Sequence, residues 1–246
     1  METIAVRGIL AALGVAASML LAVAPSSAET PQQHDWCYGK GGATPEMKMA
    51  GCTAFIISGD HSDVEVAYAF HTRGGAHAQR GEWDSALSDF TTSVELDPTI
   101  AAAFYNRGVA YLHEKDLDRA ISDFDQALKL DPVLMVAYNN RGTAYYRKGD
   151  FDQAITDFSE AVRLEARFVR GWSNRALAYY DKQDYEHSIE DYTTAVGLDP
   201  DNPLVLYGRG LAKQKHNDPK GGAADIMAAK KLDPDVVKDF AGLVAK

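Results

Sequence analysis

The sequence predicts an all-α protein, an α-solenoid of about five stacked helical hairpins. One fragment returns every 34 residues: a large side chain, then Arg three residues later, then Gly or Ala. Small and large apolar side chains recur inside each copy at spacings of three and four, the period of a helix face. A period this strict is typical of arrays whose units contact only their neighbours. The fragments are Phe70 with Arg73 and Gly74; Phe104 with Arg107 and Gly108; Tyr138 with Arg141 and Gly142; Trp172 with Arg175 and Ala176; and Leu206 with Arg209 and Gly210.

Each copy contains two expected helices. In residues 101–134, Phe104 and Gly108 share a face of the first half, and Ala120 and Phe124 share a face of the second. The small residues let two helices approach closely, while the aromatic rings fill the seams. A Leu-Asp-Pro sequence then ends most copies, because the residue before Pro is pushed out of the helical region. Each copy is therefore predicted to be a hairpin of two amphipathic helices.

The period divides the chain into repeats 1 to 5, and positions are counted from the first residue of each. The repeats are residues 67–100, 101–134, 135–168, 169–202 and 203–236. Repeat 5 departs most from the pattern, with Lys213 at position 11 and Pro219 at position 17. Terminal repeats are often atypical because one side faces water. We expect residues 237–246 to form a C-terminal capping helix.

The pattern resembles the tetratricopeptide repeat family. The shared features are a large residue at position 4, Gly or Ala at 8, an aromatic at 11, small residues at 20 and 27, an aromatic at 24 and Pro at 32. The resemblance covers residues 67 to about 236. It implies a superhelix whose inner wall is formed by the first helices, at positions 2, 5, 6, 9, 12 and 13. It also implies action by binding a protein or peptide segment.

Position 6 holds three consecutive asparagines, Asn106, Asn140 and Asn174. Each amide offers one acceptor and two donors, which suits the backbone of an extended peptide. Tyr and Arg, which are over-represented at binding hot spots, lie around them. The alternative is a solvated position copied by duplication. The candidate groove residues around the asparagines are Tyr105, Asn139, Tyr146, Arg147, Arg170, Tyr180 and Tyr207.

Every repeat also has Arg at position 7 and Asp at position 23. A constant separation of 16 residues places the two on facing helices of one hairpin. We therefore predict structural ion pairs that fix helix register, which need no ligand. The pairs are Arg73 with Asp89, Arg107 with Asp123, Arg141 with Asp157, Arg175 with Asp191, and Arg209 with Asp225.

Residues 1–28 have the layout of a secretory signal peptide. Arg7 precedes an apolar run over 8–24, and Ser26 and Ala28 suit a cleavage before Glu29. We expect an exported protein, periplasmic or secreted. The alternative is a retained membrane anchor, because 17 apolar residues are at the lower limit of a bilayer span.

The two cysteines, Cys37 and Cys52, both fall in residues 29–66, between this segment and the repeats. In an exported chain we interpret them as one disulfide. Cys52 lies 34 residues before Ala86, so residues 29–66 are expected to form an N-terminal cap that includes the second helix of a degenerate repeat. A redox or metal pair is the weaker alternative, since no C-x-x-C is present.

Composition and motifs argue against several classes of function. Acidic residues outnumber basic ones 35 to 25, for a net charge of -10, so nucleic acid is not an expected partner. No metalloprotease, hydrolase or phosphate-loop motif is present, and we predict neither an enzyme nor a cofactor. The expected function is a non-catalytic scaffold whose protein or peptide partner the sequence does not identify, with membrane contact only if residues 8–24 are retained. The alternative is a small-ligand or metal-binding receptor using His71, His77 and His113.

Overall fold

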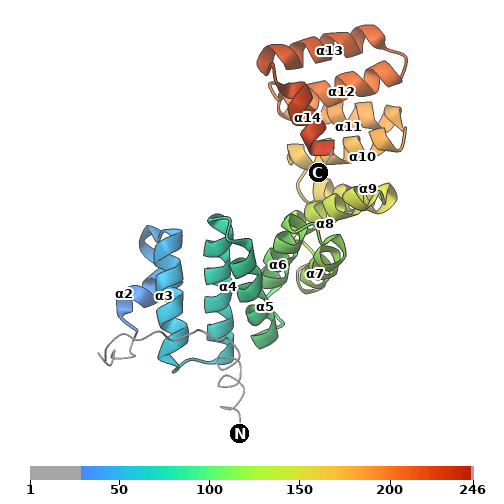
Figure 1. Cartoon of the computed structure of the whole chain (residues 1–246). Helices are drawn as coiled ribbons and strands as arrows, with labels where there is room; N and C mark the ends of the chain where they lie inside the picture. Colours follow the sequence, from blue (N-terminus) through green and yellow to red (C-terminus); the bar gives the residue numbers. More distant parts are fainter. Residues whose placement is uncertain (1–28, 245–246) are drawn as a thin grey trace.

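The computed structural model describes residues 29–244, with side chains up to Ala241. This part of the chain consists of α-helices and one short 3-10 helix, with no β-strand. Helical hairpins stack one after another into an elongated, curved array, with its two ends far apart (Figure 1). The predicted α-solenoid is confirmed.

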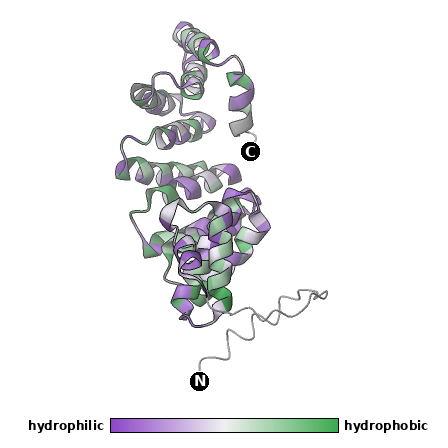
Figure 2. Cartoon of the chain, turned by 90° about the vertical axis from the view of Figure 1, so that its left-hand side faces the viewer, coloured by the Kyte–Doolittle hydropathy of each residue, from purple (hydrophilic) through white to green (hydrophobic). Residues whose placement is uncertain are grey.

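Each repeat contributes a first and a second helix. The first helices are α4 (Asp63–Gln79), α6 (Ala101–His113), α8 (Met135–Lys148), α10 (Val169–Asp181) and α12 (Pro203–Lys215). The second helices are α5 (Trp83–Leu96), α7 (Leu117–Leu130), α9 (Phe151–Leu164), α11 (Tyr185–Leu198) and α13 (Pro219–Leu232). Figure 2 shows hydrophilic and hydrophobic residues mixed along the same helices, as expected when one side of each helix is buried.

The turns inside the hairpins share one geometry. The residue at position 15 has a left-handed backbone conformation in all five repeats, with φ between 61° and 79°. In repeats 2 to 5, position 16 is an Asp that caps the second helix by accepting a backbone hydrogen bond. The residues at position 15 are Gly81, Lys115, Gly149, Gln183 and Asn217.

The array curves with its first helices inside. Each first helix contacts the next first helix, and among the described helices no second helix contacts the next second helix. Second helices therefore spread on the outer face while first helices converge. We call the surface formed by positions 2, 5, 6, 9, 12 and 13 of α4, α6, α8, α10 and α12 the inner wall.

The core of each hairpin depends on a small residue at position 8. A Cβ on Gly74, Gly108 or Gly142 would stand 2.8 Å from the ring of the Phe at position 24 of the same repeat. These rings, from Phe90, Phe124 and Phe158, are fully buried. Glycine is required there because the ring lies directly against the helix backbone.

The N-terminal cap contains α2 (Pro31–Cys37), the 3-10 helix Lys40–Gly42 and α3 (Pro45–Ser58). The predicted disulfide between Cys37 and Cys52 is present, and both residues are buried. Gly51 lets α2 lie directly on α3, since a Cβ there would be 2.9 Å from the backbone nitrogen of Cys37. α2 and α3 thus form a short hairpin ahead of repeat 1.

The register of α3 differs from the expectation of 34 residues. α3 corresponds to α5 with an offset of 38 residues, which aligns Cys52 with Phe90 instead of Ala86. The cause is α4, which has 17 residues where α6 has 13 and so begins four residues early, at Asp63. The same shift appears in the contacts: Arg73 bonds to Thr53 across 20 residues, whereas Arg175 bonds to Ser159 across 16.

The predicted C-terminal helix forms as α14 (Val236–Val244) but does not cover α13. It packs mainly against α12, and in Figure 1 it runs back along the array towards α10. Val236 is buried beside Leu206, and Phe240 meets Tyr207 edge-on at 5.2 Å. The outer side of α13 therefore stays open to solvent.

The expected signal peptide, residues 1–28, lies outside the described residues. Within residues 29–244, no helix is both long and apolar enough to cross a membrane.

Candidate interaction surface

The asparagines at position 6 link neighbouring repeats. Each one bonds to the position-5 residue of the preceding repeat, so a chain of side-chain hydrogen bonds runs along the inner wall. The bonds are Asn106 Nδ2 with His71 Nε2 at 2.8 Å, Asn140 Nδ2 to the Tyr105 hydroxyl at 3.1 Å, and Asn174 Nδ2 to Asn139 Oδ1 at 3.0 Å.

These bonds reduce what the asparagines can offer a partner. One amide nitrogen of each is engaged with the neighbouring repeat, and Asn139 is a buried residue whose own amide donates to Asn140 Oδ1 at 3.3 Å. Buried amides need such partners, because an unpaired one is costly. Of the predicted groove residues, Asn139 therefore lies inside the array, and the three asparagines hold repeats together.

Besides Tyr105, the other three predicted groove tyrosines also have partners within the chain. The Tyr146 hydroxyl donates a hydrogen bond to Asp181 of the next repeat, and burial followed by this bond raises the pKa of Tyr146 above its ordinary value. Tyr207 is covered on one side by Phe240 of α14. Tyr180 keeps a half-buried ring edge-on to Tyr185 at 5.5 Å. Helix α14 thus covers part of the wall in repeat 5, and it contacts no first helix of repeats 1 to 4.

The charge of the wall is opposite to that of the chain. Its positions across the five repeats contain the cations Arg147, Arg170 and Lys215, and a single carboxylate, Asp181. That carboxylate accepts the Tyr146 hydrogen bond. A chain of net charge -10 therefore presents a cationic inner wall.

Arg147 and Arg170 are the two arginines at wall positions, and they differ from the position-7 arginines, which are paired with aspartates. Among the described residues neither has a carboxylate within ion-pair distance, and the same is true of Arg167 in the turn before α10. Arg147 donates only to the carbonyl of Leu112, at 3.4 Å, and partial burial lowers its pKa. Half-buried apolar side chains lie on the same wall, at Leu112, Val136 and Leu177. A partly desolvated guanidinium without a partner can accept a carboxylate from another molecule.

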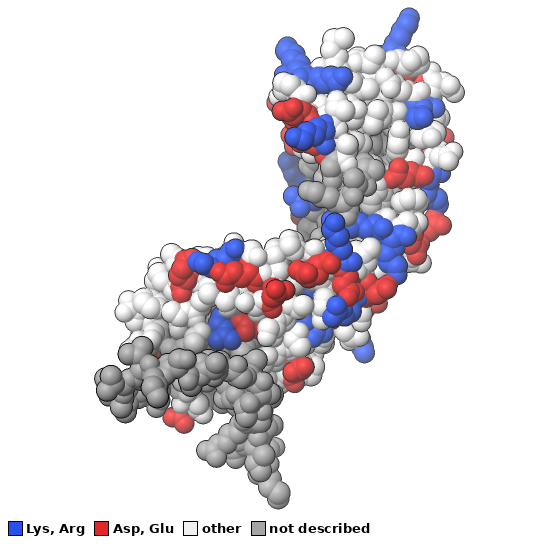
Figure 3. Space-filling view, in the orientation of Figure 1, with Lys and Arg blue, Asp and Glu red and all other residues white. Residues whose placement is uncertain are grey.

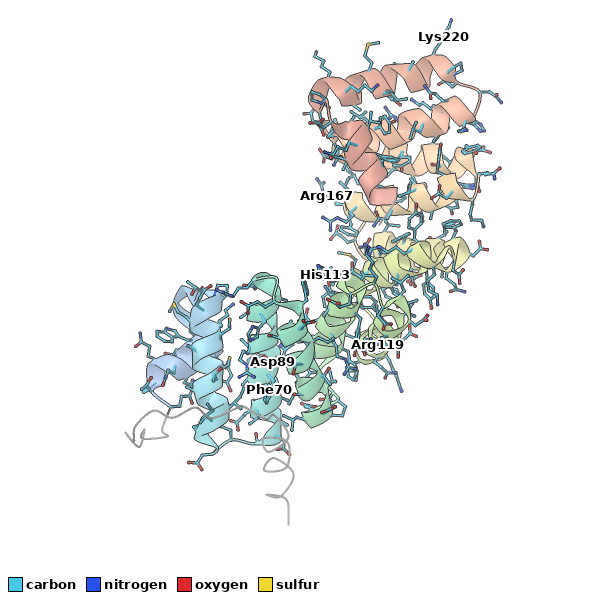
Figure 4. The ribbon with its side chains drawn as sticks, viewed as in Figure 1. Phe70, Asp89, His113, Arg119, Arg167 and Lys220 are labelled. Carbon is cyan, nitrogen blue, oxygen red and sulfur yellow. A yellow bond between two sulfur atoms is a disulfide. The ribbon has the colours of Figure 1, made fainter. Side chains whose placement is uncertain are left out.

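The arginines at position 7 are satisfied inside their hairpins. All five make two parallel hydrogen bonds to the Asp at position 23, at 2.6 to 2.8 Å, and the five aspartates are buried. In repeats 1 to 4 the guanidinium also lies over the ring at position 4, as at Arg73 above Phe70 at 5.1 Å. Figure 4 places Phe70 and Asp89 in the same first hairpin. These pairs are internal and lie apart from the wall.

The three histidines of the receptor alternative do not come together. His71 bonds to Asn106, His77 contacts Glu82 at 2.6 Å, and His113 stacks on Trp83 at 4.3 Å. Among residues 29–244 there is no group of three or more His, Cys, Asp or Glu that could hold a metal ion. The structure therefore does not support the metal form of that alternative.

Some features were not predicted from the sequence. Lys148 and Lys182, both at position 14, form ion pairs with Asp118 and Asp152 at position 18 of the preceding repeat. A constant separation of 30 residues could have indicated them. The excess of basic residues on the wall could also have been counted from the sequence, because the wall positions follow from the repeat pattern.

Comparison with known proteins agrees with the geometry. Models described as tetratricopeptide repeat match residues 101–132 and 139–203. No curated protein sequence matches this chain significantly. The chain is similar to a solved MamA protein, with 18% identity over 71% of this chain and 95% of that one and a TM-score of 0.64. MamA from Desulfovibrio magneticus RS-1 gives 22% identity, coverage of 69% and 96%, and a TM-score of 0.65.

A third similar structure is YrrB, described as a TPR protein with an unusual peptide-binding site. It shares 16% identity over 71% of this chain and 92% of its own, with a TM-score of 0.62. At these identities the solved structures establish the fold, and the matched family models establish the repeats within it. Residues 101–132 and 139–203 of this chain are therefore tetratricopeptide repeats, and the whole array has the fold of such repeats.

Proposed function

We propose that this protein is a non-catalytic scaffold whose inner wall, over repeats 2 to 4, binds a segment of a partner protein. A general role as a protein-interaction scaffold accords with the tetratricopeptide repeats. The observation that supports the position of the site is the pair of wall arginines, Arg147 and Arg170, which have no carboxylate partner among residues 29–244 of an acidic chain. YrrB, which has a similar fold, is described as having a peptide-binding site.

The partner segment is expected to be acidic and partly apolar. Carboxylates would pair with Arg147 and Arg170, and apolar side chains would cover the half-buried Leu112 and Leu177. Charge complementarity raises the association rate and rejects wrong partners, while burial of apolar area supplies affinity. We therefore expect binding that weakens as the salt concentration rises.

An exported location, periplasmic or secreted, is part of the proposal. A buried disulfide is formed and kept in oxidising compartments, and it supports this location. A membrane-anchored scaffold is the alternative if residues 8–24 are retained. Mass spectrometry of the N-terminus of protein purified from the expressing cell distinguishes the two, because a cleaved chain is expected to begin at Glu29.

The test of the site is a cross-linked pull-down from envelope extract with two variants. Arg147→Glu combined with Arg170→Glu reverses the charge of the wall and should lose the captured partner. Arg163→Glu is the matched control, since Arg163 is an exposed arginine on α9, a second helix of the outer face. Equal capture by wild type and the double variant, with melting temperatures matched, would move the interface away from the inner wall.

Alanine substitution of the three asparagines is not a suitable test of the site. Those substitutions remove the hydrogen bonds between repeats and would lower stability as well as binding. The arginine variants break no ion pair within the described residues, and the one bond between repeats that they remove is the long one from Arg147 to the Leu112 carbonyl, at 3.4 Å.

A further inference from the structure

Much of the hydrogen-bonding capacity of the inner wall is used inside the array. The three position-6 asparagines donate to the preceding repeat, and the hydroxyls of Thr143 and Ser173 donate to carbonyls of their own helices at 2.9 and 3.1 Å. An extended peptide carries one donor and one acceptor on every residue, and each needs a partner when it leaves water. A helix pairs these groups internally. The wall is therefore better suited to a helix than to an extended chain.

Helix α14 already lies on this wall. A first helix that continues the array packs mainly on the second helix before it, as α12 does on α11, but α14 packs mainly on α12. Val236 of α14 belongs to an apolar cluster against which Leu204 packs, and Phe240 meets Tyr207 at 5.2 Å. Leu204 and Tyr207 are at wall positions 2 and 5 of repeat 5. The wall of repeat 5 thus holds a helix by its apolar side.

Repeats 2 to 4 present a similar surface, with cations added. Helix α14 contacts none of their first helices. Half-buried apolar side chains lie at position 9 of repeats 2 and 4, which are Val109 and Leu177, and at Leu112. Figure 3 shows Lys and Arg side chains at the bend of the array, where α8 and α10 lie in Figure 1.

The two wall arginines lie on opposite edges of this surface. Hydrogen bonds join nearly equal positions of neighbouring repeats, as Asn140 with Tyr105, so the first helices run side by side in one direction. Arg170 stands near the start of α10, at position 2, and Arg147 near the end of α8, at position 13. A rise of about 1.5 Å per residue separates them by about 16 Å along the helix direction. The apolar residues at position 9 lie between these edges.

We propose that the inner wall recognises an amphipathic helix of the partner, with an apolar stripe bordered on both sides by Asp and Glu. The inference rests on the proposed function and adds the form of the bound segment. The helix lies along the array, in line with α14, with its stripe over Leu112 and Leu177. Its two rows of carboxylates reach Arg147 on one edge and Arg170 on the other. Residues spaced i, i+3, i+4 and i+7 then determine specificity.

The test is a selection of displayed peptides on the full chain, purified from the expressing cell. Two libraries of peptides of about 18 residues, five helical turns, share the same randomised Asp, Glu and apolar positions. One has an Ala and Gln framework that favours a helix, and the other has Pro at every fourth position, which prevents one. A wall-dependent binder loses about tenfold or more in affinity on the Arg147→Glu, Arg170→Glu variant and none on Arg163→Glu.

We expect wall-dependent binders from the helical library alone, with carboxylates on both borders of the stripe. One Pro in the middle of a selected peptide should weaken its binding roughly a hundredfold, because it breaks the helix. Circular dichroism should show that the peptide gains helix on binding. Melting temperatures equal to wild type show that the charge variants are folded.

Two kinds of failure are distinguishable. Wall-dependent binders from the Pro library, at affinities equal to or above those of the helical library, would overturn the helical form and leave the proposed function in place. The absence of any wall-dependent binder from both libraries would overturn the inner wall as a binding site, and the proposed function with it. Helical binders that hold both variants equally would do the same, since their site lies elsewhere on the chain.

Discussion

The hydroxyl oxygen of Tyr192 lies 2.6 Å from the point at which Gly208 would carry a Cβ. In repeats 1 to 3 the ring at position 24 is Phe, it lies against Gly at position 8, and the next repeat has Asn at position 6. In repeat 4 the position-8 residue is Ala176, so its methyl group occupies that space and Tyr192 lies against Gly208 instead. Ala176, Tyr192 and Gly208 thus all depart from the pattern, and the missing side chain at Gly208 makes room for the ring that the methyl group of Ala176 displaces.

This relationship predicts that Gly208→Asn, which copies the other repeats, is destabilising. The new side chain would overlap the Tyr192 ring, and overpacking of this kind costs about 1–3 kcal/mol. Adding Tyr192→Phe should recover part of the loss. Urea unfolding of the two single variants and the double variant measures the coupling. Additive effects would show that the two residues do not share this space.

Asp157→Ala should be among the most destabilising substitutions of a charged residue. Asp157 is 3% exposed and holds Arg141 by two hydrogen bonds, so its removal leaves a partly buried guanidinium and should cost roughly 3–5 kcal/mol. Asp125→Ala is the control, because Asp125 bonds to the same arginine at 2.6 Å but is exposed. An exposed pair contributes about 0–1 kcal/mol. Equal losses in urea melts would contradict this account.

Gln183→Gly should raise stability slightly. Gln183 has φ of 64°, a backbone conformation that costs a side chain about 1 kcal/mol and costs glycine little. The gain is expected to stay below that figure, since glycine has a more flexible unfolded state. Gly149→Ala, the reverse change at the same position of repeat 3, should lower the melting temperature. If both variants melt as wild type does, backbone strain at position 15 is negligible.

Stability should depend on pH through His71. Burial lowers the pKa of His71 below its ordinary value of 6.5, and its Nδ1 is buried without a partner among the described residues. As the pH falls below about 6.5, the unfolded chain binds a proton that the folded chain does not, so stability is full above that pH and declines below it. The slope from one such group is at most about 1.4 kcal/mol per pH unit.

His71→Asn isolates this effect, because repeat 3 naturally pairs Asn139 with Asn174 at the equivalent positions. The variant should lose less stability than wild type between neutral pH and pH values below 6.5. Chemical unfolding across that range checks the difference. Parallel curves for the two proteins would assign the pH dependence to other groups.

Reduction of the disulfide should release α2. This helix has seven residues, too few to be stable alone, and the 15-residue separation of its cysteines contributes about 3 kcal/mol in the chain-entropy model. Hydrogen exchange in α2 should rise strongly on adding a thiol reductant, while α8 to α11 should change little. A Cys37→Ala, Cys52→Ala variant should exchange alike with and without reductant. Protection of α2 that survives reduction would show that packing on Gly51 suffices.

The sequence by itself determined the hairpin array. The 34-residue period, the helical spacing of Phe104 with Gly108 and of Ala120 with Phe124, and the constant separation of Arg and Asp at positions 7 and 23 are local or periodic features. They recur in every repeat, and five copies of one signal make the assignment secure. The disulfide could be predicted because the two cysteines are the only ones in the chain and both lie in the short stretch between the N-terminal segment and the repeats.

Only the tertiary structure decided which polar groups are free. Asn106 and Asn174 read as open ligand positions in the sequence, but stacking brings each to the position-5 residue of the preceding repeat. Likewise α14 lies on α12 instead of α13, and one extra turn of α4 shifts α3 by four residues. Contacts between repeats depend on how helices tilt against each other, and such tilts are set by the packing of many side chains together. No single repeat carries that information.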